Sequence, residues 1–515
     1  MARLPSLLRN QRLTLLGAAF VVAGSAVAYG DTGYPFLGPG FAALLGVSAI
    51  AALVLALPLA FRPAARAAAF AIGFTYFIDV AYIGGGWVAG AAIMGLAGYL
   101  TYLVCWRRNE TVVAFATTTV AVSVAFILPQ QAFFPSQFAP SSFALAQGRA
   151  DAGRPYVHII LDEMSPLDMM PKGPFYEELK LRMAEDYRRR GFDLFQDTVA
   201  PAGETIVSLS EVFAHGDGEM HNYAETGGTF TYAMGENRAA AKLSEAGYAI
   251  TMLQNDYLQI CKPEHGTCLT YGRTGNGAAL AQRADDSLTA TGYALRATGL
   301  RLLISNSVRA SAYVQEVGAV AEWFGFELPE WDRDFARPPL TLAMMEDAAP
   351  ALARLQGGEA VFMHFLLPHY PYLLDADCRV KPVGQARAPL WVARHIALEF
   401  EAAATERAYW EQAACTHGRL MALIDAVLSS PGGKDAIILV HGDHGSRLST
   451  RMIDDTTSES VRRHTLLTHF AVRGLTGRHD RLAAGTGLRE RVSIVLDAAL
   501  DAPDPEPGLM SSAMR

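Results

Sequence analysis

The stretch from Ile437 to Arg447, with the sequence IILVHGDHGSR, is an apolar run that stops abruptly in a cluster of His, Asp and Gly. A run of β-forming residues that ends in glycines predicts a buried strand entering a tight loop. In an open α/β sheet, ligands bind just outside the carboxyl ends of the strands. Asp443 and His444 follow this strand, and an oxygen beside a nitrogen suits a divalent cation. The alternative is a polar turn capped by Asp443, so the metal interpretation needs partners elsewhere in the chain.

The N-terminal quarter of the chain predicts a membrane unit, residues 1–128. The chain has 515 residues, enough for two or three domains, and 51% of them are hydrophobic. That apolar excess is concentrated before residue 128, in spans close to the ~20 residues that cross a bilayer as a helix. The five predicted spans are Leu13–Tyr29, Phe41–Phe61, Ala67–Ile83, Trp87–Cys105 and Val112–Leu128.

Arginines indicate how this unit is oriented. They stand before the first span, between the second and third, and between the fourth and fifth, whereas the loops 30–40 and 84–86 contain no Lys or Arg. By the positive-inside rule, the N-terminus is cytoplasmic and everything after residue 128 lies outside. The Ala- and Arg-rich composition favours a bacterial inner membrane with a periplasmic domain. The net charge of -8, without a basic stripe, argues against a nucleic-acid partner.

After a Pro-rich linker, residues 129–154, short apolar runs alternate with amphipathic stretches, which is typical of an α/β domain, residues 155–500. The predicted strand Tyr156–Leu161 ends on Asp162 and Glu163, and paired acids at a strand end suit metal ligation. The alternative is that they begin a helix, where acids are also favoured. The acidic, Pro-rich tail, residues 501–515, is predicted to be disordered.

A hydroxyl-rich helix is predicted over Thr205–Phe213, after the turn residue Gly203. Thr205 then lies near unpaired backbone N–H groups and the positive end of the helix dipole, a place that favours phosphate. This position makes Thr205 a candidate nucleophile, with Ser208 and Ser210 as rivals. The alternative is that Thr205 serves only as an N-cap.

Two histidines flank the end of a further strand. The run AVFMHFLLPHYPY, residues 360–372, places His364 in the predicted strand and His369 in a Pro-fixed loop beyond it. A buried strand histidine is commonly a core residue, but a pair at a strand end suits catalysis or metal binding. The other predicted elements are helices Phe175–Arg190 and Glu399–Leu428, and strands Gly247–Leu253, Ala436–Val440 and His469–Val472.

Four of the five cysteines lie in the predicted exterior domain. An even number of cysteines in an oxidising compartment predicts two disulfides, most simply Cys261–Cys268 and Cys378–Cys415. A thiolate zinc site is the alternative. Cys105 lies in the predicted membrane unit.

Taken together, four motifs resemble the alkaline phosphatase/sulfatase superfamily. With five preceding apolar spans, the arrangement is similar to lipoteichoic acid synthases and phosphoethanolamine transferases. The motifs are Leu161-Asp162-Glu163, Thr205-x-x-Ser208-Leu209-Ser210, His364-x-x-x-x-His369-Tyr370-Pro371-Tyr372 and His441-Gly442-Asp443-His444-Gly445. The resemblance implies a five-helix transmembrane unit followed by an alkaline-phosphatase-like domain with a mostly parallel central sheet and helices on both faces.

The resemblance also implies a set of site residues. Carried over position by position, the metal ligands are Asp162, Thr205, Asp443 and His444, with Thr205 as the nucleophile. Glu163 is a further possible ligand, and which of the two adjacent acids ligates is left open. The histidines that contact the phosphoryl oxygens, or a second metal, correspond to two further residues, His364 and His369. Mn²⁺, Mg²⁺ or Zn²⁺ suits such ligands, and recruitment of both histidines would favour two Zn²⁺.

The implied activity is transfer of a phospho-headgroup, of the phosphoglycerol or phosphoethanolamine type, from a phospholipid to an envelope glycan or lipid. A phosphothreonine at Thr205 would be the intermediate. A phosphatase or phosphodiesterase that uses water is the alternative, and a non-catalytic envelope-binding protein is a second one. Sulfate-ester hydrolysis is disfavoured, because the only near match to the sulfatase C/S-x-P-x-R motif is Cys261–His265, which lacks the Arg.

Overall fold

A computed structural model describes most of the chain from residue 144 onward. The described ranges are 144–148, 153–214, 223–226, 231–272, 337–393, 401–448, 457–475, 479–484 and 486–500, with short helical pieces within 19–50 and 280–294. The chain divides into two compact units, Met1–Gln137 with Thr274–Phe335, and Phe138–Arg273 with Ala336–Arg515.

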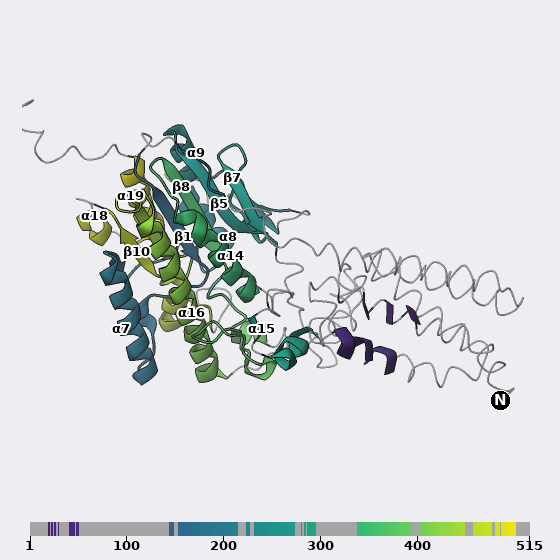
Figure 1. Ribbon diagram of the computed structural model, residues 1–515. Helices are drawn as coiled ribbons and strands as arrows, with labels where there is room; N and C mark the ends of the chain where they lie inside the picture. The colour runs from purple at the N-terminus through teal and green to yellow at the C-terminus, as the bar shows by residue number, and fades with distance from the viewer. Residues whose placement is uncertain are drawn as a thin grey trace, which may run out of the picture. The chain divides into compact units, whose positions relative to one another are not determined.

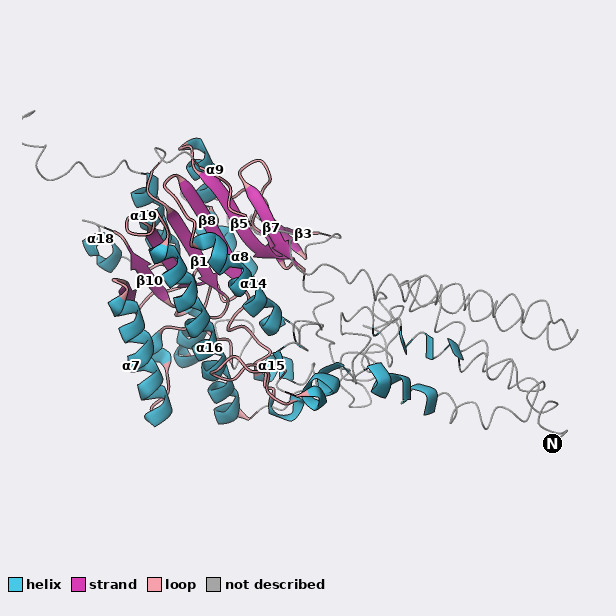
Figure 2. Cartoon of the chain, in the orientation of Figure 1, coloured by secondary structure: helices cyan, strands magenta, loops and turns pink. Residues whose placement is uncertain are grey.

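The second unit is built on a mostly parallel sheet, as the sequence predicts (Figures 1 and 2). Its strand order is β2-β10-β9-β1-β8-β5-β7. The strands from β9 to β7 run parallel, and β10 and β2 extend the sheet in antiparallel fashion at one edge. The strands are β1 Tyr156–Leu161, β2 Asp193–Phe195, β5 Ala249–Asn255, β7 Thr267–Tyr271, β8 Glu359–Phe365, β9 Ile437–Gly442 and β10 Phe470–Arg473. A small sheet comprises β3 Tyr223–Glu225, β4 Tyr232–Met234 and β6 Leu258–Gln259.

Helices cover both faces of the large sheet (Figure 1). Helices α8, α9 and α19 share a hydrophobic core with one face of the sheet. On the other face, α14 packs against α16, and α16 packs against α7. The helices of this unit are α7 Pro174–Arg189, α8 Thr205–Phe213, α9 Arg238–Glu245, α14 Arg337–Leu352, α15 Leu390–Ala393, α16 Ala402–Ser429, α17 Glu459–Leu466, α18 His479–Ala484 and α19 Leu488–Leu500. Short 3-10 turns lie at Leu167–Met169 and Val383–Gln385.

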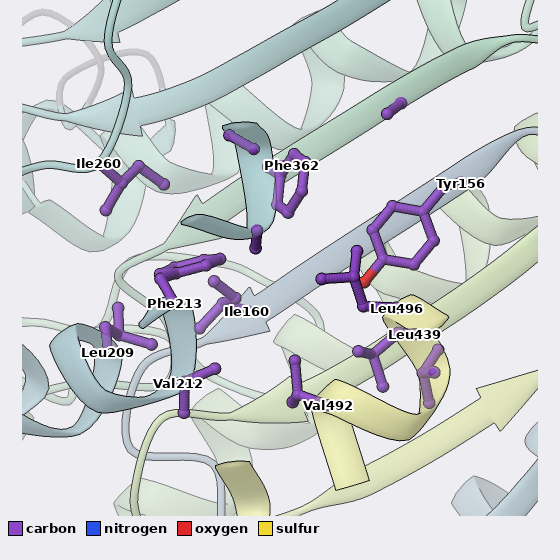
Figure 3. Close-up of a cluster of buried hydrophobic side chains, with 14 of the residues drawn as sticks. Tyr156, Ile160, Leu209, Val212, Phe213, Ile260, Phe362, Leu439, Val492 and Leu496 are labelled. Atoms are coloured by element: carbon purple, nitrogen blue, oxygen red, sulfur yellow. The ribbon is translucent and has the colours of Figure 1, made fainter. Parts of the chain in front are cut away.

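The core on the α8 side is formed by alternate residues of the strands. Figure 3 shows Tyr156 and Ile160 of β1 with Phe362 of β8, against Phe213 of α8 and Leu496 of α19. Because side chains alternate between the two faces of a strand, the residues between these point to the α16 side. Every residue of β1, β8 and β9 is buried, which explains why these strands appear in the sequence as continuous apolar runs.

The predicted elements of this unit are confirmed, with boundaries that shift by up to three residues at either end. The helix at Thr205–Phe213 and the strand at Tyr156–Leu161 have the predicted bounds. The helix predicted over Glu399–Leu428 is α16, and the strand predicted over His469–Val472 is β10.

The predicted membrane unit falls largely outside the described residues. Three of the five predicted spans, those from residue 67 to 128, lie wholly outside them, and the first two are described only in pieces. In the described part of the chain, no helix is both long enough and apolar enough to cross a membrane. The tail 501–515 also lies outside the described residues, and the predicted boundaries 128, 155 and 500 stay predictions.

Both predicted disulfides are present. Cys261 pairs with Cys268, at a sequence separation of 7, and Cys378 pairs with Cys415 of α16, at a separation of 37. The alternative of a thiolate zinc site is therefore wrong.

The two disulfides are expected to stabilise the fold unequally. A crosslink lowers the entropy of the unfolded chain more when it closes a longer loop. Replacing Cys378 and Cys415 by Ser should cost about 4 kcal/mol, against about 2 kcal/mol for the Cys261 and Cys268 pair. Urea unfolding of the two double variants, followed by tryptophan fluorescence, measures the difference. Equal losses would contradict the expectation.

Candidate metal centre

The predicted site residues meet at the carboxyl edge of the parallel strands. Strand β1 lies between β8 and β9, and its last residue, Leu161, pairs with Phe365 and Gly442. Because parallel strands end at the same edge, Asp162 and Asp443 emerge side by side. Both carboxylates are buried, with exposed fractions of 1% and 0%.

Thr205 is the first residue of α8 and faces this pair. Its Oγ1 lies 3.5 Å from Asp162 Oδ1 and 3.4 Å from His444 Nε2. The N-cap position is taken by Glu204, so the alternative of Thr205 as the N-cap is wrong. As a residue of the first helical turn, Thr205 belongs to the part of α8 whose N–H groups have no partner within the helix.

The rival hydroxyls are held by backbone oxygens. Ser208 donates to the carbonyl of Asp443 at 2.6 Å, and so fastens the loop after β9 to α8. Ser210 donates to the carbonyl of Ile206 within its own helix, at 2.5 Å. Among the three predicted hydroxyls, the structure brings Thr205 to the carboxylates.

The ring of His444 is oriented as a metal ligand requires. Its Nδ1 lies 2.9 Å from the carbonyl oxygen of Gly445, so this nitrogen carries the proton and donates it. The lone pair of Nε2 is then directed to the site, 3.4 Å from Asp443 Oδ2 and 3.9 Å from Asp162 Oδ1. A backbone carbonyl that fixes the tautomer in this way is typical of metal-binding histidines.

Several buried polar atoms here have no hydrogen-bond partner among the described residues. They are Asp443 Oδ2, Glu163 Oε2 and both ring nitrogens of His364. One ligand atom from each of Asp162, His364 and Asp443 lies within 4.8 Å of the others. By contrast, Asp443 Oδ1 accepts the backbone N–H groups of Glu163, at 3.0 Å, and His444, at 2.8 Å. Unpartnered oxygen and nitrogen atoms that converge in a buried site fit a divalent cation.

The electrostatics of the site also suit a cation. Burial, with the charges of Asp443 and Glu163, raises the pKa of Asp162 well above its usual range. Burial alone would raise the pKa of Asp443 too, but the neighbouring His444 and His364 outweigh it and lower that pKa. Burial lowers the pKa of each of these two histidines to about 4. Both rings are therefore neutral near pH 7, which is the form that binds metals.

Glu163 turns away from this group. Its Oε1 accepts from Nε of Arg447 at 3.0 Å and pairs with Arg447 Nη2 at 2.9 Å. It also lies 3.9 Å from Nε2 of His369. Glu163 adopts a φ of 65°, which is unusual for a residue with a side chain, directly after the strand ends. The structure therefore brings together four of the five predicted ligands, and Glu163 forms a buried ion pair beside them.

His369 lies beside Glu163 and is buried, with an exposed fraction of 6%. Its Nδ1 donates to the carbonyl of Tyr370 at 2.6 Å, which leaves the lone pair on Nε2. Burial, with the charges of Arg337 and Arg447, lowers the pKa of His369 well below its usual range. Sequence reasoning assigned no role to these two arginines. Arg447 stands two residues after the DHG motif and was a visible signal, but Arg337 lies at the start of α14, in a region that shows no motif.

His441 has a structural role at the end of β9. Its Nε2 lies 2.7 Å from Nε2 of His158, and His158 Nδ1 lies 3.1 Å from the hydroxyl of Tyr156. His441 Nδ1 donates to the carbonyl of Gly442 at 2.8 Å. Both ring nitrogens of His441 are therefore occupied, and it joins β9 to β1 instead of facing the carboxylates.

Comparison with solved structures finds similarity to phosphoethanolamine transferases and sulfatases. The C-terminal periplasmic domain of EcEptC from Escherichia coli, in complex with Zn, matches with a TM-score of 0.38 and 11% identity, over 70% of this chain and 86% of that one. The integral membrane lipooligosaccharide phosphoethanolamine transferase A from Neisseria meningitidis matches with a TM-score of 0.37 and 10% identity, over 96% and 88%. A 2-O GAG sulfatase matches with a TM-score of 0.37 and 14% identity, over 69% and 72%.

Phosphoethanolamine transferases were also among the proteins that the sequence motifs resemble. At the level of sequence, no family model and no curated protein matches the chain.

If the carboxylates form a cation site, Asp162→Asn should change stability in opposite directions without and with metal. Without metal, the substitution relieves repulsion from Asp443, so Tm should stay equal or rise by a few degrees. With Zn²⁺ or Mn²⁺ at about 100 times its Kd, the wild type should gain about 2.7 kcal/mol and the variant far less. Thermal unfolding after chelation and after metal addition measures both.

Asp425→Asn is the matched control, because Asp425 pairs with Arg190 at the surface, at 2.7 Å. It should respond to metal as the wild type does. A variant Asp162→Asn that gains as much from metal as the wild type would remove Asp162 from the ligand set.

Proposed function

We propose that the protein is a metal-dependent phosphotransferase, which moves a phospho-headgroup from a phospholipid to an envelope glycan or lipid through a phosphothreonine at Thr205. The observation that carries this proposal is the position of the Thr205 hydroxyl. It lies at the start of α8, within 3.5 Å of both Asp162 Oδ1 and His444 Nε2. A hydroxyl beside a cation site and a helix N-terminus is placed for attack on a phosphoryl group.

In this proposal the cation is held by Asp162, Asp443, His444 and Thr205. When bound, it would lower the pKa of the Thr205 hydroxyl and neutralise charge on the phosphoryl oxygens. His364 lies with the two carboxylates, its Nε2 4.0 Å from Asp162 Oδ2, and is suited to a second ion. Imidazole ligands favour Zn²⁺ over Mg²⁺, and the single-ion set also suits Mn²⁺. In this proposal Glu163 is not a ligand and instead positions Arg447 through their ion pair. The alternative is that Glu163 also binds the cation.

The first chemical step forms one bond and breaks one bond. Thr205 Oγ1 attacks the phosphorus of the lipid phosphodiester and forms a Thr–O–P ester. The bond from phosphorus to the diacylglycerol oxygen breaks, and diacylglycerol leaves with the proton that Thr205 loses.

The second step returns the enzyme to its starting state. An acceptor hydroxyl or amine attacks the phosphothreonine, its proton is taken up by a base, and Thr205 recovers its hydroxyl. Between the two candidate histidines, His369 suits this role because it is 6% exposed, whereas His364 is fully buried, and because the lone pair of its Nε2 is available. Its lowered pKa keeps the ring neutral near neutral pH. Arg337 adds positive charge near His369, which suits an anionic substrate.

The identity of the donor rests on the predicted membrane unit. Five apolar spans with arginines on alternate sides would hold the domain at the outer leaflet of a bacterial inner membrane, where phospholipid is the available phosphodiester. Water in place of the acceptor would make the protein a phosphodiesterase.

The intermediate gives the direct test. Incubation of the full chain with phosphatidylethanolamine or phosphatidylglycerol and Zn²⁺ or Mn²⁺, followed by acid quench and mass spectrometry, should detect an adduct on the peptide with Thr205. Its mass names the headgroup. Thr205→Val should abolish the adduct and lower turnover by at least about 10³-fold, since the nucleophile is lost. An adduct on another residue, or full turnover by Thr205→Val, would overturn the proposal.

Ser210→Ala is the control, because the Ser210 hydroxyl is bound within its own helix, and it should retain the adduct. Labelled lipid then separates the two reactions. Label on a glycan or lipid supports a transferase, and free headgroup from the wild type supports a phosphodiesterase.

A further inference from the structure

One glutamine of α16 holds the loop that carries His369. The amide nitrogen of Gln412 lies 3.1 Å, 2.9 Å and 3.3 Å from the carbonyl oxygens of Pro368, His369 and Pro371. Its amide oxygen accepts the backbone N–H groups of two residues further along, Leu373 at 2.9 Å and Leu374 at 3.1 Å. The Gln412 side chain is fully buried. One side chain thus binds five backbone groups of a single loop.

One turn earlier, Tyr409 holds the loop after β1. Its hydroxyl donates to the carbonyl of Glu163 at 2.7 Å and accepts the N–H of Ser165 at 2.9 Å. Tyr409 is also fully buried, and it contacts Tyr372 of the other loop edge to face, with ring centroids 5.6 Å apart. The loop that it binds begins at Asp162, one of the two central carboxylates.

These two residues and Cys415 are spaced three apart, so they lie along one side of α16. Cys415 is disulfide-bonded to Cys378, at the far end of the same His369 loop. The contacts of this loop with α16 therefore include the Gln412 amide and a covalent bond. Such a loop has no strand neighbours along residues 366–371, so its backbone groups need partners from side chains.

We propose that Tyr409 and Gln412 are positioning residues that hold two separate parts of the site. Gln412 fixes the loop that presents His369 to the substrate, whereas Tyr409 fixes the loop that carries Asp162. This inference rests on the proposed function, because it assigns the first loop to substrate handling and the second to the cation. It follows that the two residues, although one helical turn apart, affect different steps.

The two proposed roles predict different defects, one in kcat and the other in the Kd for Zn²⁺. Gln412→Met keeps the shape and removes the five contacts, so it should leave the Kd for Zn²⁺ within about twofold of wild type. It should lower kcat for headgroup release by about 100-fold, since small displacements of reacting groups have effects of that size. Tyr409→Phe removes one oxygen and should raise the Kd for Zn²⁺ about tenfold, as losses behind metal ligands do. Saturating Zn²⁺ should then restore most of its kcat.

The experiment compares these variants in the full chain with Thr416→Val. Thr416 is buried on the same helix, but its hydroxyl donates to the carbonyl of Gln412 within α16, at 2.8 Å, and reaches neither loop. Each protein is assayed for Zn²⁺ affinity by chelator competition, for phospholipid turnover, and for hydrogen exchange of residues 366–374. Gln412→Met should speed exchange of the Leu373 and Leu374 amides, and Thr416→Val should change none of the three measurements.

The readouts keep the two proposals apart. If the wild type shows no turnover and no adduct, the proposed function fails, while the exchange and Zn²⁺ data still test how the loops are held. If the wild type is active and Gln412→Met matches it in kcat and exchange, the role of Gln412 is wrong. If Tyr409→Phe and Gln412→Met weaken Zn²⁺ binding equally, the division between the two loops is wrong. Gln412→Glu, which keeps only the acceptor, should protect the Leu373 amide but not restore kcat.

Discussion

Asp162 and Asp443 are buried next to each other at the end of the central strands, and the surrounding groups are arranged around that pair. Placing one ionised carboxylate in a protein interior costs several kcal/mol, and a second one adds repulsion. The protein offsets part of this cost with the backbone N–H groups of Glu163 and His444, which bind Asp443 Oδ1. The nearest buried guanidinium, Arg447, is paired with Glu163 instead. The remaining charge is what a divalent cation would neutralise.

The pairing of β1 between β8 and β9 creates this arrangement. Side chains alternate along a strand, so even-numbered residues from Tyr156 to Ile160 face α8, and Asp162 follows them on that side. Asp162 thereby meets Thr205, while Glu163 meets Arg447 and the loop of His369. Two adjacent acids acquire different surroundings because the backbone turns directly after the strand, where Glu163 adopts a φ of 65°. Burial raises the pKa of Glu163 to about 7, although Arg447 opposes that shift.

Much of this was accessible from the sequence, for identifiable reasons. Apolar runs that end in polar residues mark buried parallel strands, so Asp162 and Asp443 were predicted at strand ends, and the family resemblance implied that they share a site with Thr205. Both cysteine pairings were also predicted. The orientation of Glu163 was left open, although strand alternation alone favours Asp162 as the residue that faces Thr205.

Other parts of the site carry no local signal. Gln412 sits in an ordinary amphipathic helix, and its five partners are about forty residues away in the chain. Arg337 lies beyond a long segment without motifs. Contacts of this kind depend on how α14 and α16 pack on the sheet, and periodicity does not encode which polar residue of a helix meets which loop.

The roles proposed for Tyr409 and Gln412 follow from where the candidate site residues lie. Asp162 and Asp443 directly follow strands and gain rigidity from the sheet, whereas His369 lies four residues beyond the end of β8, too far to be held by it. A group that must meet a substrate within a few tenths of an ångström needs fixed neighbours, and the helix supplies them through Gln412 and the Cys378–Cys415 bond. The buried Gln412 amide holds the loop near its start, and the disulfide holds it near its end. In this loop, His369 Nδ1 donates to the carbonyl of Tyr370, which leaves the lone pair on Nε2, 3.9 Å from Glu163 Oε1. The Gln412 amide and the disulfide therefore restrain the loop that carries His369, the residue whose Nε2 stays available for chemistry.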